Sequence, residues 1–217
     1  MKIIVFGANG RTGKLIVNQA LAKGHAVTAF VRTSGGLPQD PHLRVIEGDV
    51  NDFKAVVDAV RGHRAVLSAL GANSRKKSDV LATAIPHMLE AMRQEYVNRL
   101  IVLGAAGVGP DWGKYQNALT RFALWMAKKT ALRHPFIDQT AQERLIAASD
   151  LDYTIVRAPR LMDGPFTGAY RVLPDALPSG ATRVNRADVA DFMLQQLTDP
   201  RFHRQGPYIG SVDSKEA

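Results

Sequence analysis

Three glycines near the start of the chain, Gly7, Gly10 and Gly13, carry the clearest chemical signal in the sequence. Glycines at this spacing let a chain turn sharply, let its backbone approach a pyrophosphate without a Cβ in the way, and let the next helix pack close to a strand. The free N–H groups at the start of that helix then face the anion. The spacing alone is a weak signal, because a tight turn between a strand and a helix can use the same glycines without a ligand.

Arg32 is the second candidate, and it indicates which dinucleotide would bind. Sites selective for NAD carry an acid at the end of the second strand, where it accepts a hydrogen bond from the ribose 2′-hydroxyl. Here Arg32-Thr33-Ser34 occupies that place, and a cation suits the 2′-phosphate of NADP(H) instead. The alternative is a solvated arginine at a strand end that binds no ligand.

The segments around the glycines predict the elements that would position them. Residues 2–6 are an apolar run, Leu15, Ile16 and Ala20 follow at helical spacing, and residues 26–31 are a second apolar run. This order of strand, glycine-rich turn, helix and strand is the opening βαβ unit of a dinucleotide-binding sheet.

Strands and helices continue to alternate along the chain, which favours a parallel sheet with right-handed crossovers. We expect strands over 43–46, 65–70, 100–103, 152–157, 169–173, 182–184 and 208–209, and helices after Asp52, from Ser78, over 117–132, over 137–148 and over 188–197. The predicted fold class is α/β: a doubly wound Rossmann-type parallel sheet flanked by helices, with a small C-terminal extension on the substrate side. Residues 1–217 are expected to form a single NAD(P)-binding domain, because the chain is long enough for one well-cored domain and short for two.

Two tryptophans mark the segment after the fifth strand. Leu119, Phe122 and Met126 give residues 117–132 an amphipathic helical pattern, and Trp125 within it is expected to lie in the core. Trp112 lies in a loop of glycine and proline at the carboxyl edge of the sheet, where it could line a pocket.

Composition excludes several kinds of site. The chain has no cysteine, which excludes disulfides, thiolate catalysis and thiolate metal sites, and its six histidines lack metal-ligand spacing, so no metal is expected. No apolar run approaches the roughly 18–20 residues of a membrane helix. The first strand begins at once, so we expect no signal peptide and a cytoplasmic location. The formal charge of +8 comes from dispersed residues without a recognition motif, so specific nucleic-acid binding is not favoured.

Further segments give the chain a specific resemblance. Residues 150–159 read DLDYTIVRAP, residues 164–170 read GPFTGAY, and residues 186–190 read RADVA, in addition to GANGRTG at 7–13. With these motifs the chain resembles, over essentially its whole length, the atypical short-chain dehydrogenases/reductases of the NAD(P)H-binding, nitrogen-repressor-like group. Within that group it is most similar to the biliverdin and NADPH-flavin reductases.

The resemblance implies a cofactor site by position. The implied contacts are Gly7, Asn9, Gly10, Arg11, Thr12 and Gly13 for the pyrophosphate, Arg32 for the 2′-phosphate, Asp49 and Val50 for the adenine, Leu70 and Gly71 for the ribose, and Pro159, Arg160 and Leu161 in the loop over the nicotinamide. Asp49 can instead be an acid at the start of the next helix. The family often places a second cation a few residues after the first one. Here Gly35 and Gly36 hold those positions, which leaves one arginine for the 2′-phosphate.

On the substrate side, Trp112, Met162 and Phe166 are candidates for the pocket wall. Arg160 could stabilise developing negative charge or bind a substrate phosphate or carboxylate, or it could clamp a cofactor phosphate. Arg160 stands where the flavin and biliverdin reductases have a histidine. The loop after the fifth strand reads Gly104-Ala105-Ala106 where relatives commonly carry serine. No tyrosine has a lysine four residues on, so no catalytic residue is assigned.

These departures favour a particular chemistry. Hydride transfer to a flavin or quinone needs two flat rings held face to face, and the proton can come from water, whereas a carbonyl reduction needs a placed acid. The sequence therefore predicts an NADPH-dependent oxidoreductase whose partner is a small-molecule electron acceptor: a flavin, a quinone or a linear tetrapyrrole. The alternative is a non-catalytic NADP(H)-binding regulator that senses redox state and contacts a partner protein. A sugar-nucleotide or isoflavone-type reductase would need more chain after the sixth strand.

Overall fold

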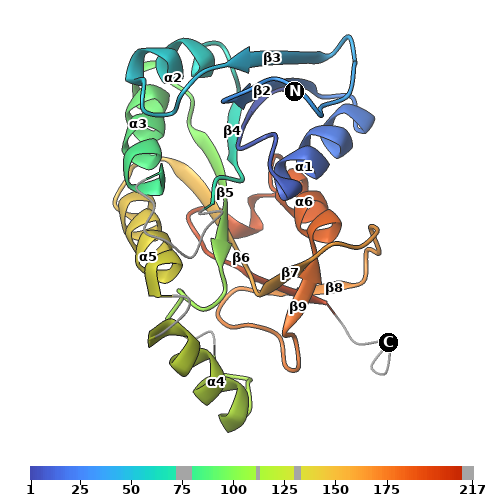
Figure 1. Ribbon diagram of the computed structural model, residues 1–217, viewed down its shortest axis with the longest axis vertical. Helices are drawn as coiled ribbons and strands as arrows, with labels where there is room; N and C mark the ends of the chain where they lie inside the picture. The colour runs from blue at the N-terminus through green and yellow to red at the C-terminus, as the bar shows by residue number, and fades with distance from the viewer. Residues whose placement is uncertain (72–79, 111–112, 130–132, 212–217) are drawn as a thin grey trace.

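The glycine-rich start of the chain forms strand β1 (Lys2–Phe6), helix α1 (Arg11–Ala22) and strand β2 (Ala26–Val31), as predicted (Figure 1). The computed structural model describes residues 1–71, 80–110, 113–129 and 133–211. Side chains of β1 alternate between two core clusters, with Ile3 and Val5 in one and Ile4 and Phe6 in the other. Because both faces of β1 are buried, this strand lies at the centre of the sheet.

The remaining elements follow the predicted order as far as β6. They are β3 (Leu43–Glu47), α2 (Phe53–Val60), β4 (Ala65–Ser68), α3 (Val80–Gln94), β5 (Arg99–Ala105), α4 (Ala118–Lys129), α5 (Arg133–Ala147), β6 (Asp152–Ala158), β7 (Arg160–Met162), β8 (Tyr170–Leu173), β9 (Arg183–Asn185), α6 (Arg186–Gln195), a short 3-10 turn (Pro200–Phe202) and β10 (Tyr208–Ser211). The expected helix start at Ser78 and Asp79, and the end of the helix expected over 117–132, lie outside the described residues.

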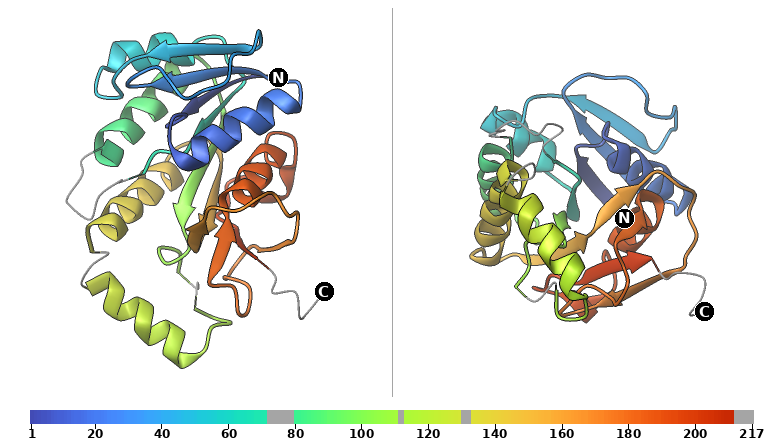
Figure 2. Two further views of the ribbon diagram at one scale, coloured as in Figure 1. Left: turned by 45° about the vertical axis from the view of Figure 1, so that its right-hand side comes forward. Right: turned by 60° about the horizontal axis from the view of Figure 1, so that its bottom comes forward.

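The main sheet has the strand order β3-β2-β1-β4-β5-β6-β10-β8. Its strands pair in parallel except for β8, which runs antiparallel to β10. Helices α1 and α6 cover one face, and α2, α3 and α5 cover the other (Figures 1 and 2). The order 3-2-1-4-5-6 is that of a doubly wound dinucleotide-binding sheet, so the predicted α/β Rossmann-like fold class is confirmed.

The segment after β6 differs from the prediction. Pro159, Arg160 and Leu161 were expected to form a loop, but residues 160–162 form β7, which pairs in parallel with β9. The backbone N–H of Arg160 also donates a hydrogen bond to the carbonyl of Thr182 (3.3 Å). A three-residue pairing is too short to leave a periodic pattern in the sequence, so the prediction of a loop over Arg160 and Leu161 was wrong.

Helix α4 is the second difference. Its sequence pattern placed Trp125 in the core, but 48% of that residue is exposed, as are 76% of Leu119 and 60% of Phe122. The helix projects beyond the sheet in Figure 1 and in the left view of Figure 2, and these side chains belong to neither core cluster. Phe122 and Trp125 instead stack on each other, with ring centroids 5.8 Å apart. Within the part of the chain that the structure describes, no helix has both the length and the apolar character to cross a membrane.

Candidate active site

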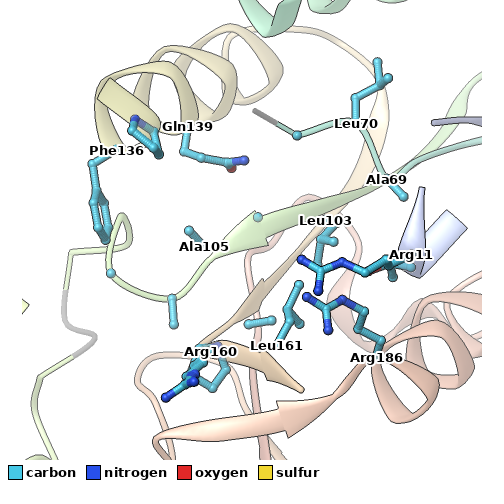
Figure 3. Close-up of a pocket in the computed structure, with 18 of the residues that line it drawn as sticks. Arg11, Ala69, Leu70, Leu103, Ala105, Phe136, Gln139, Arg160, Leu161 and Arg186 are labelled. Carbon is cyan, nitrogen blue, oxygen red and sulfur yellow. The ribbon is translucent and has the colours of Figure 1, made fainter. Parts of the chain in front are cut away.

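A cavity of about 670 Å³ lies at the carboxyl ends of β1, β4, β5 and β6 (Figure 3). This is the edge at which open parallel α/β sheets bind their ligands, and the volume is within the range of small-molecule sites. Phe136 of α5 lines it, together with five leucines from α3, β5, β7, the loop after β4 and the segment before β9: Leu70, Leu81, Leu103, Leu161 and Leu177. The end of β5 and the residues after it, 104–107, also line the cavity.

The glycine-rich turn lies at one end of this cavity. Gly7 has φ +73°, and a Cβ on it would lie 2.9 Å from the backbone of Ala69 and Leu70; a Cβ on Gly13 would overlap with the carbonyl oxygen of Gly7. The turn therefore presses against the end of β4, and α1 packs directly on the turn. The N-cap of α1 is Gly10, which has no side chain to bond the free N–H groups of the first turn. Gly10, Arg11 and Thr12 line the cavity, so the start of the helix faces it. A backbone cradle that no side chain could share fits a pyrophosphate.

Three arginines line the cavity: Arg11, Arg160 and Arg186. Arg11 and Arg186 lie on one side of it, opposite Phe136 and Gln139 of α5, and Arg160 lies apart from them on the chain that leaves β6 (Figure 3). Arg11 and Arg186 both bind the carboxylate of Asp163, with nitrogen–oxygen distances of 3.2 and 2.6 Å. One carboxylate between two guanidinium groups leaves a net positive charge.

Arg160 adds to that charge. Its side chain is exposed, and among the described residues its guanidinium has no ion pair. The described residues that line the cavity include no aspartate or glutamate. The site therefore favours an anionic ligand such as a dinucleotide.

Gln139 is a polar residue of the cavity that the sequence analysis missed. Its Oε1 accepts a hydrogen bond from Nε2 of Gln142 (3.1 Å), and the same Nε2 lies 3.4 Å from the carbonyl oxygen of Leu103. Because Oε1 is engaged, the amide nitrogen of Gln139 is left to donate into the cavity (Figure 3). A glutamine within an amphipathic helix matches no motif, although its place on the helix leading into β6 could have marked it. Arg186 was missed as well, although it opens the RADVA segment.

The structure brings many of the predicted cofactor contacts together. The cavity lining includes Gly10, Arg11, Thr12, Leu70, Gly71, Pro159, Arg160 and Leu161. Gly7 and Gly13 form the turn behind it, and Asn9 bonds from that turn to the loop after β2, with Nδ2 donating to the carbonyl of Thr33 (3.3 Å).

Of the predicted substrate contacts, Arg160 lines the cavity. Met162 and Phe166 are not among the described residues that line the cavity, and Phe166 is 55% exposed. Trp112 lies outside the described residues.

Arg32, Asp49 and Val50 follow the neighbouring strands β2 and β3, along the same edge of the sheet. Asp49 accepts hydrogen bonds from the backbone N–H and the side chain of Asn51, both at 2.9 Å. These bonds, together with the positive charge of Arg32, hold the pKa of the Asp49 carboxyl below its usual range. The carboxylate at the start of α2 is Asp52, which accepts from the N–H of Ala55 (3.1 Å). Contact between Asp49 and an adenine stays a prediction.

A side-chain proton donor is missing from the described part of the cavity wall. The polar side chains that line it are three arginines, Thr12, Gln139 and Thr182, without tyrosine, serine, histidine, lysine or a carboxylic acid. Arginine stays protonated at any accessible pH, and the other three groups do not titrate near neutrality.

The strand order, the glycine cradle and the cationic edge together define a dinucleotide-binding α/β protein. Residues 7–200 match a protein family described as NAD(P)H-binding, and the chain belongs to that family.

Individual relatives are more distant. The chain is 27% identical over 213 residues to UPF0659 protein YMR090W of Saccharomyces cerevisiae, covering 92% of this chain and 88% of that protein. It is 31% identical over 206 residues to a 3-diazoavenalumate denitrifying reductase of Streptomyces sp, covering 82% and 64%. The solved structure of ChuY, an anaerobillin reductase from Escherichia coli O157:H7, has a TM-score of 0.79 at 24% identity and covers 100% of both chains, a likeness of fold.

Proposed function

We propose that this chain is an NADPH-dependent reductase that delivers a hydride to a flavin, a quinone or a linear tetrapyrrole. The observation that carries the proposal is the cavity at the sheet edge, which is lined by three arginines and by apolar side chains, with no titratable acid among its described lining residues. Family membership supports NAD(P)H as the cofactor, and the names of two relatives, a denitrifying reductase and an anaerobillin reductase, support reduction.

The chain's own residues would hold the cofactor along the edge of the sheet. The turn from Gly7 to Gly13 and the start of α1 take the pyrophosphate, and Arg32 takes the 2′-phosphate. Asp49 and Val50 flank the adenine, Leu70 and Gly71 the ribose, and residues 159–161 the nicotinamide. When bound, the nicotinamide supplies the hydride.

The acceptor would lie between that ring and α5. The amide nitrogen of Gln139 donates to a carbonyl oxygen of the acceptor and so fixes its orientation. The Arg160 guanidinium stabilises the negative charge that develops as the hydride arrives. The acceptor gains two electrons and one proton as hydride and one further proton from water. Met162 and Phe166 stay predicted contacts for parts of a large acceptor beyond the cavity, and Trp112 stays a predicted contact of the acceptor.

The direct test is a reduction assay. The protein is mixed with NADPH and an excess of FMN, riboflavin, a quinone or biliverdin, and the loss of nicotinamide absorbance is followed. We expect at least one acceptor to be reduced well above the background rate, and a Gly13→Val variant, whose side chain would overlap with Gly7, to show only background.

The described lining of the cavity holds no titratable proton donor, and this also suits a protein that only binds NADP(H). The alternative function, a redox-sensing regulator, rests on that observation. Background rates with every acceptor, together with unequal affinities for NADP⁺ and NADPH, would contradict the reductase and support the redox-sensing regulator.

A further inference from the structure

A lysine from helix α1 reaches the loop that follows β2. Lys14 lies in the first turn of α1, and a Cβ placed on Gly36 would lie 2.5 Å from its Nζ and 3.4 Å from its Cε. The ammonium group therefore lies directly over Gly36. This glycine has φ +71°, a conformation that other residues rarely adopt, and its missing side chain leaves the space that Lys14 occupies.

The same place is tied to the pyrophosphate turn. Asn9 donates from Nδ2 to the carbonyl of Thr33 (3.3 Å), and its Oδ1 lies 3.6 Å from the Cβ position of Gly36. The loop after β2, the turn after β1 and the first turn of α1 therefore meet at one point. Arg32 enters this loop from the end of β2.

Two cations lie at this point without a close ion pair among the described residues. Over the described ranges, neither Lys14 nor Arg32 takes part in an ion pair or a side-chain hydrogen bond. The acids near the loop have other partners: Glu47 accepts from the N–H of Ser34 (2.7 Å), and Asp49 accepts from Asn51, although Arg32 is close enough to Asp49 to act on its charge.

The position of Lys14 in its helix also favours a bound anion. The first turn of α1 has no acidic residue, and Lys14 stands there near the positive end of the helix dipole, where a cation is unfavourable. An anion bound between Lys14 and Arg32 would offset both the dipole and the repulsion between the two cations.

We propose that Lys14 is the second cation of a 2′-phosphate site and thereby a determinant of selectivity for NADP(H) over NAD(H). The inference rests on the proposed cofactor role of the chain. Gly35 and Gly36 would leave the 2′-phosphate with Arg32 alone, and Lys14 supplies from α1 the charge that the loop itself lacks. Arg32 offers a planar fork of donors, and Lys14 a mobile point charge, to the same dianionic group.

The test uses fragments that contain no nicotinamide, so that turnover plays no part. Calorimetry gives the dissociation constants of 2′,5′-ADP and 5′-AMP for the wild type, Lys14→Met and Lys14→Gln. Arg93→Met is the matched control, because Arg93 is an exposed cation at the far end of α3, paired with Glu90. We expect the wild type and the control to bind 2′,5′-ADP roughly tenfold or more tightly than 5′-AMP, and both Lys14 variants to lose roughly tenfold for 2′,5′-ADP alone.

Other outcomes separate the two proposals. Equal wild-type affinity for the two fragments overturns the inference and leaves an NADH-dependent reductase possible. An equal loss for both fragments in the Lys14 variants also overturns it, because it assigns Lys14 a structural role. If the wild type binds neither fragment nor any nicotinamide dinucleotide, the proposed function itself fails. Thermal midpoints without ligand confirm that each variant is folded.

Discussion

Arg186 shows how a buried charge is held beside the cavity. The residue is 6% exposed, and its guanidinium binds Asp163, which also holds Arg11 from the start of α1. A buried guanidinium needs a partner because its desolvation is costly. Asp163 therefore joins α6 to the glycine-rich turn and also limits the positive charge that the cavity presents.

The substitution Asp163→Asn removes this shared carboxylate. We expect the free energy of unfolding to fall by about 1–2 kcal/mol, less than for a fully buried pair because Asp163 is 66% exposed. Urea unfolding measures the change. Asp175→Asn is the matched control, because its ion pair with Lys114 is half-exposed on both sides and should contribute little to stability. A loss no larger than that of the control would contradict the role given to Asp163.

His63 predicts a pH dependence of stability. The side chain is buried, with Nε2 2.8 Å from Oγ1 of Thr28 and Nδ1 3.1 Å from the carbonyl oxygen of Val60, and burial lowers the pKa of its imidazole. As the pH falls through 6.5, the unfolded chain takes up this proton before the folded one does. The contribution of His63 is therefore fully present above that pH and is lost as the pH falls toward the folded pKa.

The measurement is the free energy of unfolding between about pH 5 and 8, where one proton accounts for at most about 1.4 kcal/mol per pH unit. We expect the wild type to lose stability toward the acid end and His63→Gln to show a shallower slope, whatever its overall stability. His42→Gln, at an exposed position, should keep the wild-type slope. Identical slopes in all three proteins would show that His63 is not held neutral.

At the scale of elements, the β1–α1 unit could be predicted because its signals are local. The glycine spacing, the apolar runs and the helical pattern all lie within 31 consecutive residues, 2–32. The placement of α4 could not be predicted, because an amphipathic pattern shows that a helix has an apolar face and not what covers it. Strand β7 depends on β9, about twenty residues further along the chain, and three residues carry no detectable period.

Gly13→Ala tests the packing of α1 on the turn. A Cβ at this position would overlap with the carbonyl oxygen of Gly7, so the helix must move away from β1. We expect the free energy of unfolding, measured by denaturation, to fall by about 1–3 kcal/mol. We also expect calorimetry to detect no binding of NADPH. Gly71→Ala is the control for stability, because a Cβ there meets no atom within 4 Å. If the Gly13→Ala protein binds NADPH as tightly as the wild type, the turn from Gly7 to Gly13 does not hold the pyrophosphate.

At the scale of the whole molecule, the topology predicted which edge of the sheet holds the site. Many of the contacts that side chains make at this edge could not be predicted from it. The carboxyl ends of parallel strands must share an edge, which placed residues 7–13, 32, 70–71 and 159–161 together. Asp163 binds Arg11 across 152 residues of sequence, and Lys14 lies over Gly36 from a different element. Such contacts depend on how helices and loops pack in space, and no local pattern records them.

Residues from both halves of the sheet line the cavity, and we therefore predict that a ligand stabilises the whole domain together. Gly10 and Leu70 come from the half around β1 and β4, whereas Ala105 and Leu161 come from the half around β5 and β6. NADPH bound across them would stabilise the folded state of both. At a free concentration of about 100 times its dissociation constant the gain is about 2.7 kcal/mol, which for a chain of this size raises the thermal midpoint by about 5–10 °C. We expect one cooperative transition with and without NADPH, shifted upward when it is present, in scanning calorimetry. The Gly13→Ala variant should show no shift. Two separate transitions, with NADPH raising only one of them, would show that the ligand contacts a single half of the sheet.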